Sequence, residues 1–332
     1  MRRPLRHAAA AVLLLAPLIA SLPTPAAAAD GDRDGGGLPA SFTLSGDPAG
    51  SQFEGIAADR RTFYVTETTG GEVHRGRVDD PATEVWLDED AALADGRRTA
   101  IGIATDRRGR VFVAGGGNRT AEGAPADAPD SWVYDDDGQL LAALRMPVDG
   151  GLFLNDVVVG PDGAAYVTDS VTPRVFRIAR EDGDWTATLW ADATAAVPQE
   201  PGTFGFNGIE VAPDEESLVV AHSTAGQLWR FDLETGTPTL VDTGSALLTQ
   251  SDGLVVRGDT LVAVRNRAHV LASLRLADDA TSAALLAEVG TDPERVLTTA
   301  DVVRGRLLLV DSQFDEDPPS QDSEVVVLPL RP

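Results

Sequence analysis

A hairpin motif that recurs along the chain constrains its fold more than any other feature. Its clearest copy is Phe153–Ser170, FLNDVVVGPDGAAYVTDS, in which two apolar runs, Val157–Val159 and Ala164–Thr168, flank a Pro-Asp-Gly turn. Apolar runs joined by a Gly-containing turn predict a β-hairpin. Five other segments align with this one, and the second residues of the six copies lie at positions 55, 102, 156, 208, 253 and 301.

The spacing of the copies predicts the architecture. A repeat of about 45 to 54 residues that contains several short strands is typical of propeller blades. The alternation within each unit has a β period, which excludes a helical solenoid. Two more strand-like runs follow each of the first five hairpins, which gives the four strands of a blade. We therefore predict an all-β, six-bladed β-propeller with four antiparallel strands per blade over residues 38–332.

The two ends of the repeat region predict how the ring closes. The sixth unit has a third strand at Glu324–Leu328 and no fourth, whereas Ser41–Ser45 forms an extra strand before the first unit. Pairing this N-terminal strand as the outer strand of blade six would close the ring and remove an open sheet edge. We predict this closure.

The first 29 residues have the three regions of a signal peptide. Arg2, Arg3 and Arg6 form the basic region, Ala8–Leu22 is apolar, and small residues precede a cleavage site after Ala29. We predict a secreted protein with a flexible leader over residues 30–37. An uncleaved membrane anchor is the alternative. No later segment is apolar enough to span a bilayer, so we expect no integral membrane segment after cleavage.

Composition excludes several classes of function. The chain has 27 basic and 52 acidic residues, a net charge of −25, which repels nucleic acid and favours cations. It has no cysteine, which excludes disulfides and Cys-based chemistry. It also has no lysine, which excludes Schiff-base chemistry and a P-loop. We expect a monomer that binds a small molecule.

The first residues of the six hairpins converge in a propeller, because the first strand of each blade lines the central channel. In chain order they are Glu54, Ile101, Asn155, Asn207, Asp252 and Ala300. Four of the six carry carboxylate or amide oxygens, the ligands that Ca²⁺ prefers. This pattern predicts a site for Ca²⁺ or another divalent cation. Alternatively, the Asn and Asp residues only make turns into the strands.

The hairpins carry a family resemblance. The segments FEGIA, FLNDVVVGPDGAAYVTDS, FNGIEVAPDEESLVVAHS and SDGLVV resemble the senescence-marker-30, gluconolactonase and luciferin-regenerating-enzyme family. The resemblance implies a central Ca²⁺ held by Glu54, Asn155, Asn207 and Asp252. The same ligand set is similar to that of squid-type diisopropylfluorophosphatase. Phe153 stands where sugar lactonases often have an arginine, and Ile56 stands where the family usually has a proline, which argues against a sugar-acid lactone as substrate.

The resemblance also implies catalytic roles. Asp252 is the predicted general base or nucleophile, because a carboxylate beside a cation can take a proton from a bound water. Asp156 would orient substrate or water. Asp169 and His222 end their second strands at the same rim and are the predicted substrate-binding residues. A rim histidine can equally be a solvated or hydrogen-bonded side chain without a catalytic role. We expect the loop 116–130 to overhang this rim.

These observations favour a secreted, Ca²⁺-dependent hydrolase of lactones or esters. A non-catalytic, ligand- or protein-binding propeller with a structural metal is the alternative, and a phosphotriesterase-like hydrolase is a third. Propellers host both enzymes and binding proteins, so the sequence leaves catalysis itself undecided.

Overall fold

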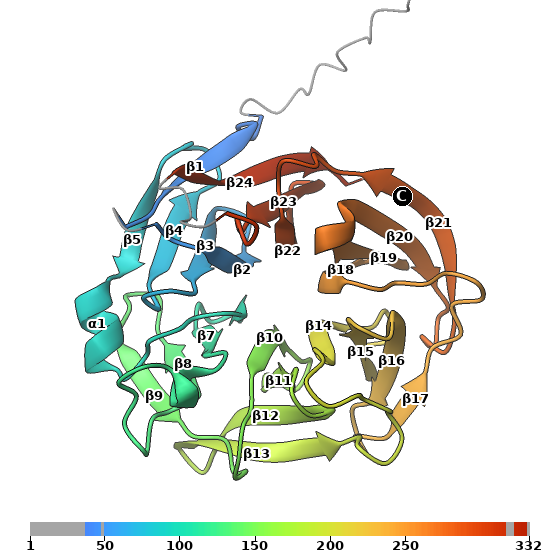
Figure 1. Ribbon diagram of the computed structural model, residues 1–332, viewed down its shortest axis with the longest axis horizontal. Helices are drawn as coiled ribbons and strands as arrows, with labels where there is room; N and C mark the ends of the chain where they lie inside the picture. Colours follow the sequence, from blue (N-terminus) through green and yellow to red (C-terminus); the bar gives the residue numbers. More distant parts are fainter. Residues whose placement is uncertain (1–36, 48–49, 317–321, 331–332) are drawn as a thin grey trace, which may run out of the picture. The chain divides into compact units, whose positions relative to one another are not determined.

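The computed structural model describes residues 37–47, 50–316 and 322–330. The predicted signal peptide and nearly all of the predicted leader lie outside these residues. The unit Leu38–Pro332 forms a six-bladed β-propeller of four-stranded antiparallel sheets (Figure 1), which confirms the predicted fold. None of the described helices is long and apolar enough to cross a membrane.

The first three blades follow one another along the chain. Blade one consists of β2 (Phe53–Ala58), β3 (Thr62–Glu67), β4 (Val73–Arg77) and β5 (Thr83–Leu87). Blade two consists of β6 (Ile103–Thr105), β7 (Val111–Ala114), β8 (Ser131–Tyr134) and β9 (Leu140–Leu144). Blade three consists of β10 (Leu154–Val159), β11 (Ala165–Asp169), β12 (Arg174–Glu181) and β13 (Asp184–Asp192).

The last three blades complete the ring. Blade four consists of β14 (Phe206–Val211), β15 (Ser217–His222), β16 (Gln227–Asp232) and β17 (Pro238–Leu240). Blade five consists of β18 (Ser251–Arg257), β19 (Thr260–Arg265), β20 (Val270–Leu276) and β21 (Ala283–Gly290). Blade six consists of β22 (Leu297–Val303), β23 (Arg306–Asp311), β24 (Asp322–Pro329) and β1 (Ser41–Ser45).

The N-terminal strand closes the ring as predicted. β1 pairs antiparallel with β24, from Ser41 opposite Val326 to Ser45 opposite Asp322. It also contacts blade one, because Thr43 N donates to Pro81 O (2.9 Å) and Thr83 Oγ1 donates to Thr43 O (2.7 Å). β1 therefore joins the last blade to the first.

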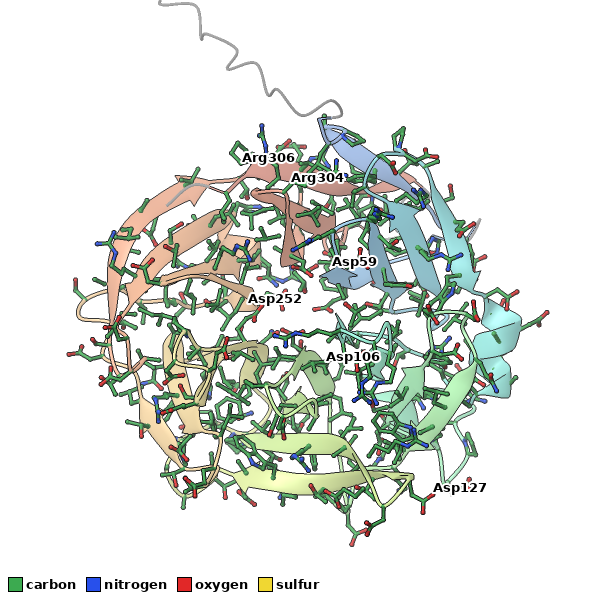
Figure 2. The ribbon with its side chains drawn as sticks, turned by 180° about the vertical axis from the view of Figure 1, so that it is seen from behind. Asp59, Asp106, Asp127, Asp252, Arg304 and Arg306 are labelled. Carbon is green, nitrogen blue, oxygen red and sulfur yellow. The ribbon has the colours of Figure 1, made fainter. Side chains whose placement is uncertain are left out.

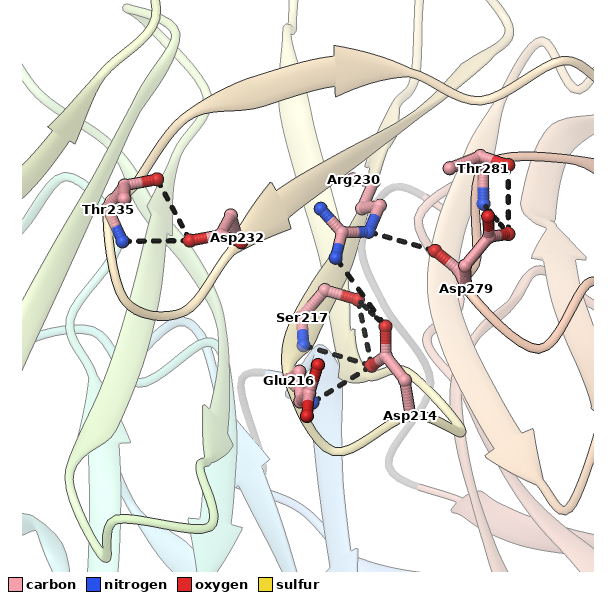
Figure 3. Close-up of polar contacts among 8 residues, drawn as sticks. All are labelled: Asp214, Glu216, Ser217, Arg230, Asp232, Thr235, Asp279 and Thr281. Atoms are coloured by element: carbon pink, nitrogen blue, oxygen red, sulfur yellow. Dashed lines mark hydrogen bonds and ion pairs between the residues drawn. The ribbon is translucent and has the colours of Figure 1, made fainter.

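The core lies between blades. Six clusters of buried apolar residues occur in the described chain, and each draws its members from two neighbouring blades. Each second strand packs against a neighbouring blade on both faces. This explains near-continuous apolar runs such as VFVA in β7 and LLLV in β23. Polar contacts add to the packing. Arg230 of blade four approaches Asp214 of the same blade (3.6 Å) and donates to Asp279 O in the β20–β21 turn of blade five (2.9 Å; Figure 3).

Three short helices among the described residues were not predicted. α1 (Glu89–Ala94) follows blade one, and Asp88 caps it by accepting a hydrogen bond from Ala91 N (2.9 Å). Two 3₁₀ helices, η1 (Asn118–Thr120) and η2 (Asn266–Ala268), lie in connections between second and third strands. The segment 116–130, which we expected to be a loop, therefore contains η1.

Candidate functional site

The first strands of five blades share a β-bulge near their starts. The pairing register shifts between Phe53 and Ile56 in blade one, and the corresponding shifts fall at 154/157, 206/209, 251/254 and 297/300. A bulge inserts an extra residue and re-aims the side chains beside it. Glu54, Asn155, Asn207 and Asp252 each occupy the first bulge position. They therefore lie at one end of the channel, which we call the mouth.

The register corrects the alignment of blade six. Its bulge contains Thr298 and Thr299, so Thr298 and not Ala300 is the counterpart of Glu54. The sequence alignment was wrong by two residues there, because this hairpin has Thr299 where the others have Gly or Asp, and Asp301 was aligned with them instead. The Thr298 hydroxyl donates to Glu54 O (2.9 Å) and Thr299 Oγ1 lies 3.5 Å from Glu54 Oε1. Both threonines therefore position Glu54.

Glycines at the second bulge position let neighbouring blades approach. A Cβ added to Gly55, to Gly208 or to Gly102, their counterpart in blade two, would clash with a carbonyl oxygen of the next blade. These oxygens belong to Ile101, Asp252 and Asn155 respectively. Threonine hydroxyl groups also donate hydrogen bonds to backbone carbonyls at the starts of the inner strands. Thr66 Oγ1 donates to Ile101 O, and Thr168 Oγ1 donates to Asn207 O at 2.8 Å. The bulge residues are thus fixed to one another around the axis.

Glu54 and Asp252 form a buried pair of like charges. Burial raises the pKa of Glu54 well above its usual range, and the negative charges of Asp252 and Asp156 raise it further. Burial also raises the pKa of Asp252 to about 6, although hydrogen bonds from Asn266 and Asn207 oppose this rise. Asn266 Nδ2 donates to Asp252 Oδ2 at 2.5 Å. Two buried carboxylates in this arrangement would be stabilised by a cation.

Asn155 presents a buried oxygen without a partner. Its Nδ2 donates to Ser170 Oγ (3.1 Å), and that hydroxyl donates to Phe206 O (2.6 Å), which fixes the orientation of the amide. Asn155 Oδ1 is buried and has no hydrogen-bond partner among the described residues. A buried polar atom of this kind requires an explanation. A cation bound by this oxygen fits the predicted ligand set.

The described residues contain no group of three or more His, Cys, Asp or Glu side chains arranged to hold a metal ion. The predicted set has only two carboxylates, Glu54 and Asp252. An ion at the mouth would therefore depend on the amide oxygens of Asn155 and Asn207 as well.

Asp156 links two blades. Its carboxylate accepts hydrogen bonds from Val157 N (2.8 Å) and from Ile209 N in blade four (3.1 Å). Burial raises its pKa to about 7. Asp301 does the same between blades six and one, where it accepts from Val302 N (2.6 Å) and Ala58 N (2.6 Å). Each acid therefore fastens one inner strand to the next.

The sequence analysis missed two acids of the channel, Glu210 and Asp301. Both lie three residues after a first bulge position, and burial raises the pKa of each carboxyl group. The nearby charges of Asp301 and Asp156 raise the pKa of Glu210 further. In each case the sequence signal was an acidic residue within the otherwise apolar first strand of a blade.

Asp169 and His222 end their second strands as expected, opposite Leu154 and Phe206. Both side chains are buried. Asp169 Oδ1 accepts hydrogen bonds from Phe153 N and Val171 N, each at 3.0 Å. His222 Nδ1 accepts from Ala225 N (3.2 Å), and burial lowers the pKa of the imidazole. Each side chain thus stabilises a turn at the mouth.

Glu67 is the matching residue of blade one, opposite Phe53, and has the same role. Its carboxylate accepts hydrogen bonds from Thr69 N (2.9 Å), Gly70 N (2.5 Å) and Gly71 N (3.1 Å). The sequence analysis did not single it out. An acid followed by a Thr- and Gly-rich turn was its signal.

Two surface clefts lie away from the mouth. Their volumes are about 700 and 880 Å³, and they are lined by turns at the opposite ends of the inner strands, including Asp59, Asp106 and Asp162. Asp59 and Asp106 directly follow β2 and β6, whereas Asp252 lies at the start of β18 (Figure 2). Neither cleft is lined by Glu54, Asn155, Asn207 or Asp252. The chemistry of the bulge residues, and not cleft size, identifies the mouth as the candidate site.

Comparison with known proteins supports the fold. No protein-family model matches the chain, and no curated protein sequence does. Similar solved structures include the allergen Mala s 1 of Malassezia sympodialis, with a TM-score of 0.63 and 16% identity over 88% of this chain and 96% of that one. They also include regucalcin of Agrobacterium tumefaciens, described as a calcium-binding protein, with a TM-score of 0.57 and 15% identity over 89% and 96%.

A luciferin-regenerating enzyme is also similar, with a TM-score of 0.54 and 13% identity over 86% of this chain and 95% of that one. Regucalcin and this enzyme are propellers of the kind that the hairpins resemble. At such low identities the similarity establishes a common fold.

Proposed function

We propose that the protein is a secreted, monomeric hydrolase of lactones or esters that depends on a divalent cation, with Ca²⁺ as the expected ion. Glu54, Asn155, Asn207 and Asp252 would hold the ion. The observation that carries this proposal is the pairing of two buried carboxylates with a buried amide oxygen that has no partner among the described residues. Hard cations take carboxylate and amide oxygens of this kind.

The chain's own residues define the proposed reaction. A bound cation would supply Lewis-acid polarisation of the carbonyl and a lower pKa for a water molecule. Asp252 takes a proton from the water whose oxygen attacks the carbonyl carbon, and Asn266 holds the carboxylate in place. When the C–O bond of the ester breaks, the proton passes from Asp252 to the departing alkoxide. Asp156 supports the site by fixing blade four beside Asn207.

The test combines metal content, substrates and one variant. Mass spectrometry of the purified protein should find a divalent cation. A panel of lactones, carboxylic esters and a phosphotriester should show turnover that a chelator abolishes. The change Asp252→Asn should lower kcat by about 10²- to 10⁴-fold, the usual contribution of a general base. Asp127→Asn, at an exposed position, is the matched control and should retain parental activity. Full activity of Asp252→Asn would refute the assigned role.

A binding protein with a structural cation is the second candidate. It is favoured by the burial of Asp169 and His222, which leaves these two predicted substrate contacts engaged in turns. A bound metal without turnover of any compound in the panel would support this function instead. Absence of metal would overturn the site itself.

A further inference from the structure

Three apolar side chains are unusually exposed at the mouth. Val171, Phe204 and Leu247 are 52%, 53% and 61% exposed, and no other large apolar side chain of the described residues reaches half exposure. They lie in the connections β11–β12, β13–β14 and β17–β18, which all emerge at the mouth end of blades three to five. The remaining exposed apolar residues lie on outer strands and α1.

Contacts join this apolar surface to the candidate site. The rings of Phe153 and Phe204 meet edge to face, with centroids 5.4 Å apart. Phe153 lies two residues before Asn155. A Cβ added to Gly116 would lie 2.6 Å from Ile101 Cγ1 and 3.4 Å from Phe153 Cζ, so these two side chains flank the same glycine. Ile101 is buried and is the blade-two counterpart of Glu54 and Asn155 in the repeat alignment.

Hydrogen bonds hold the loops that carry these side chains. Gln199 Nε2 donates to Ser170 O (2.9 Å), Val171 O (3.1 Å) and Thr203 O (3.0 Å). Thr224 Oγ1 donates to Phe204 O (2.7 Å). A Cβ added to Gly226 would lie 3.0 Å from Leu247 Cδ1, which places that leucine against the β15–β16 turn. The surface is therefore preformed, which favours ligand binding.

We propose that this apolar rim, Phe153, Val171, Phe204 and Leu247, binds an aromatic or branched alkyl group of the ligand whose carbonyl lies at the bulge residues. The inference rests on the proposed function and names its substrate class as aryl- or alkyl-substituted lactones and esters. A polyhydroxylated sugar lactone has no apolar group to bury on this rim and would therefore gain no affinity from it.

Calorimetric titration tests the proposal without turnover. The probes are a phenyl-substituted γ-lactam, which resists hydrolysis, and unsubstituted 2-pyrrolidinone. The parent protein should bind the phenyl lactam about 10- to 200-fold more tightly, the usual range for apolar discrimination. Phe204→Ser and Leu247→Ser should each reduce this preference severalfold. The controls Leu93→Ser and Leu240→Ser, at residues 49% and 47% exposed on α1 and β17, should leave it unchanged.

Each outcome has one meaning. Equal affinity for the two lactams, or equal effects of rim and control variants, would overturn the apolar rim. A phenyl preference in a protein that hydrolyses no ester would support the rim and refute the hydrolase. Ester turnover without a phenyl preference would support the hydrolase and refute the apolar rim.

Discussion

At the scale of single residues, Gly208 shows how the site depends on contacts between blades. An added Cβ would clash with Asp252 O and lie 2.7 Å from Leu254 N, and both are backbone atoms that a rotamer change cannot move. The same contact recurs at Gly55 and Gly102. These glycines are therefore required for close approach of the inner strands and not for an unusual backbone angle.

We predict that Gly208→Ala destabilises the fold by about 1–3 kcal/mol or more, because overpacking forces backbone shifts. The shift would also displace Asp252 and weaken cation binding. Denaturant unfolding and calorimetric Ca²⁺ titration measure the two effects. Gly151→Ala is the matched control, since an added Cβ there meets nothing within 4 Å. If both variants unfold at the same denaturant concentration as the parent, the packing argument is wrong.

The candidate site residues were predictable where they repeat. Glu54, Asn155, Asn207 and Asp252 share one position of a recurring hairpin, so the alignment alone placed them at one end of the channel. The engagement of Asp156 by Ile209 N was not predictable, because the two residues are far apart in sequence and meet only when blades three and four pack.

At the scale of elements, β1 contributes more than its five residues suggest. Phe42 and Leu44 are fully buried in the cluster between blades six and one. β1 also covers the edge of β24 and bonds to blade one through Thr43. Such a strand joins elements from opposite ends of the chain and stabilises both.

We predict that a chain beginning at residue 50 loses cooperative unfolding or melts far below a chain beginning at residue 38. Loss of a buried phenylalanine alone costs about 3–5 kcal/mol, a large part of the stability of a typical domain. Circular dichroism melts of the two truncated chains make the comparison. Equal melting temperatures would show that closure by β1 does not stabilise the ring.

α1 marks the limit of prediction at this scale. It has six residues, fewer than a helix needs to be stable in isolation. Its sequence shows no long helical period, and its formation depends on the Asp88 cap and on Ala92, which is buried. Whether such a short helix forms therefore depends on its tertiary packing.

At the scale of the whole molecule, charge opposes folding. The chain has a net charge of −25, and the ring concentrates acids such as Glu54, Asp156, Glu210, Asp252 and Asp301 along one channel. Compaction brings these charges together, and self-repulsion destabilises a compact state. Added salt screens this repulsion.

We predict that the melting temperature rises by several degrees between 10 and 500 mM NaCl, and that tetramethylammonium chloride has a similar effect. Differential scanning fluorimetry at fixed pH measures this dependence. Millimolar CaCl₂ at constant ionic strength should add a second increase in the parent and not in Asp252→Asn, because binding to the folded state alone stabilises it. A melting temperature that falls with NaCl would contradict the first expectation.

The sequence by itself determined the number of blades, their strand composition, the closing strand and four residues at the mouth. It could do so because a repeated unit shows its period and register in local patterns of apolar and turn residues. Only the tertiary structure decided that blade six places Thr298 at the mouth, that Asp156 and Asp301 fasten neighbouring blades, and that Phe204 and Leu247 stand exposed beside the bulge residues. The physical reason is that these features arise from contacts between blades, where packing and hydrogen bonding depend on residues far apart in the chain.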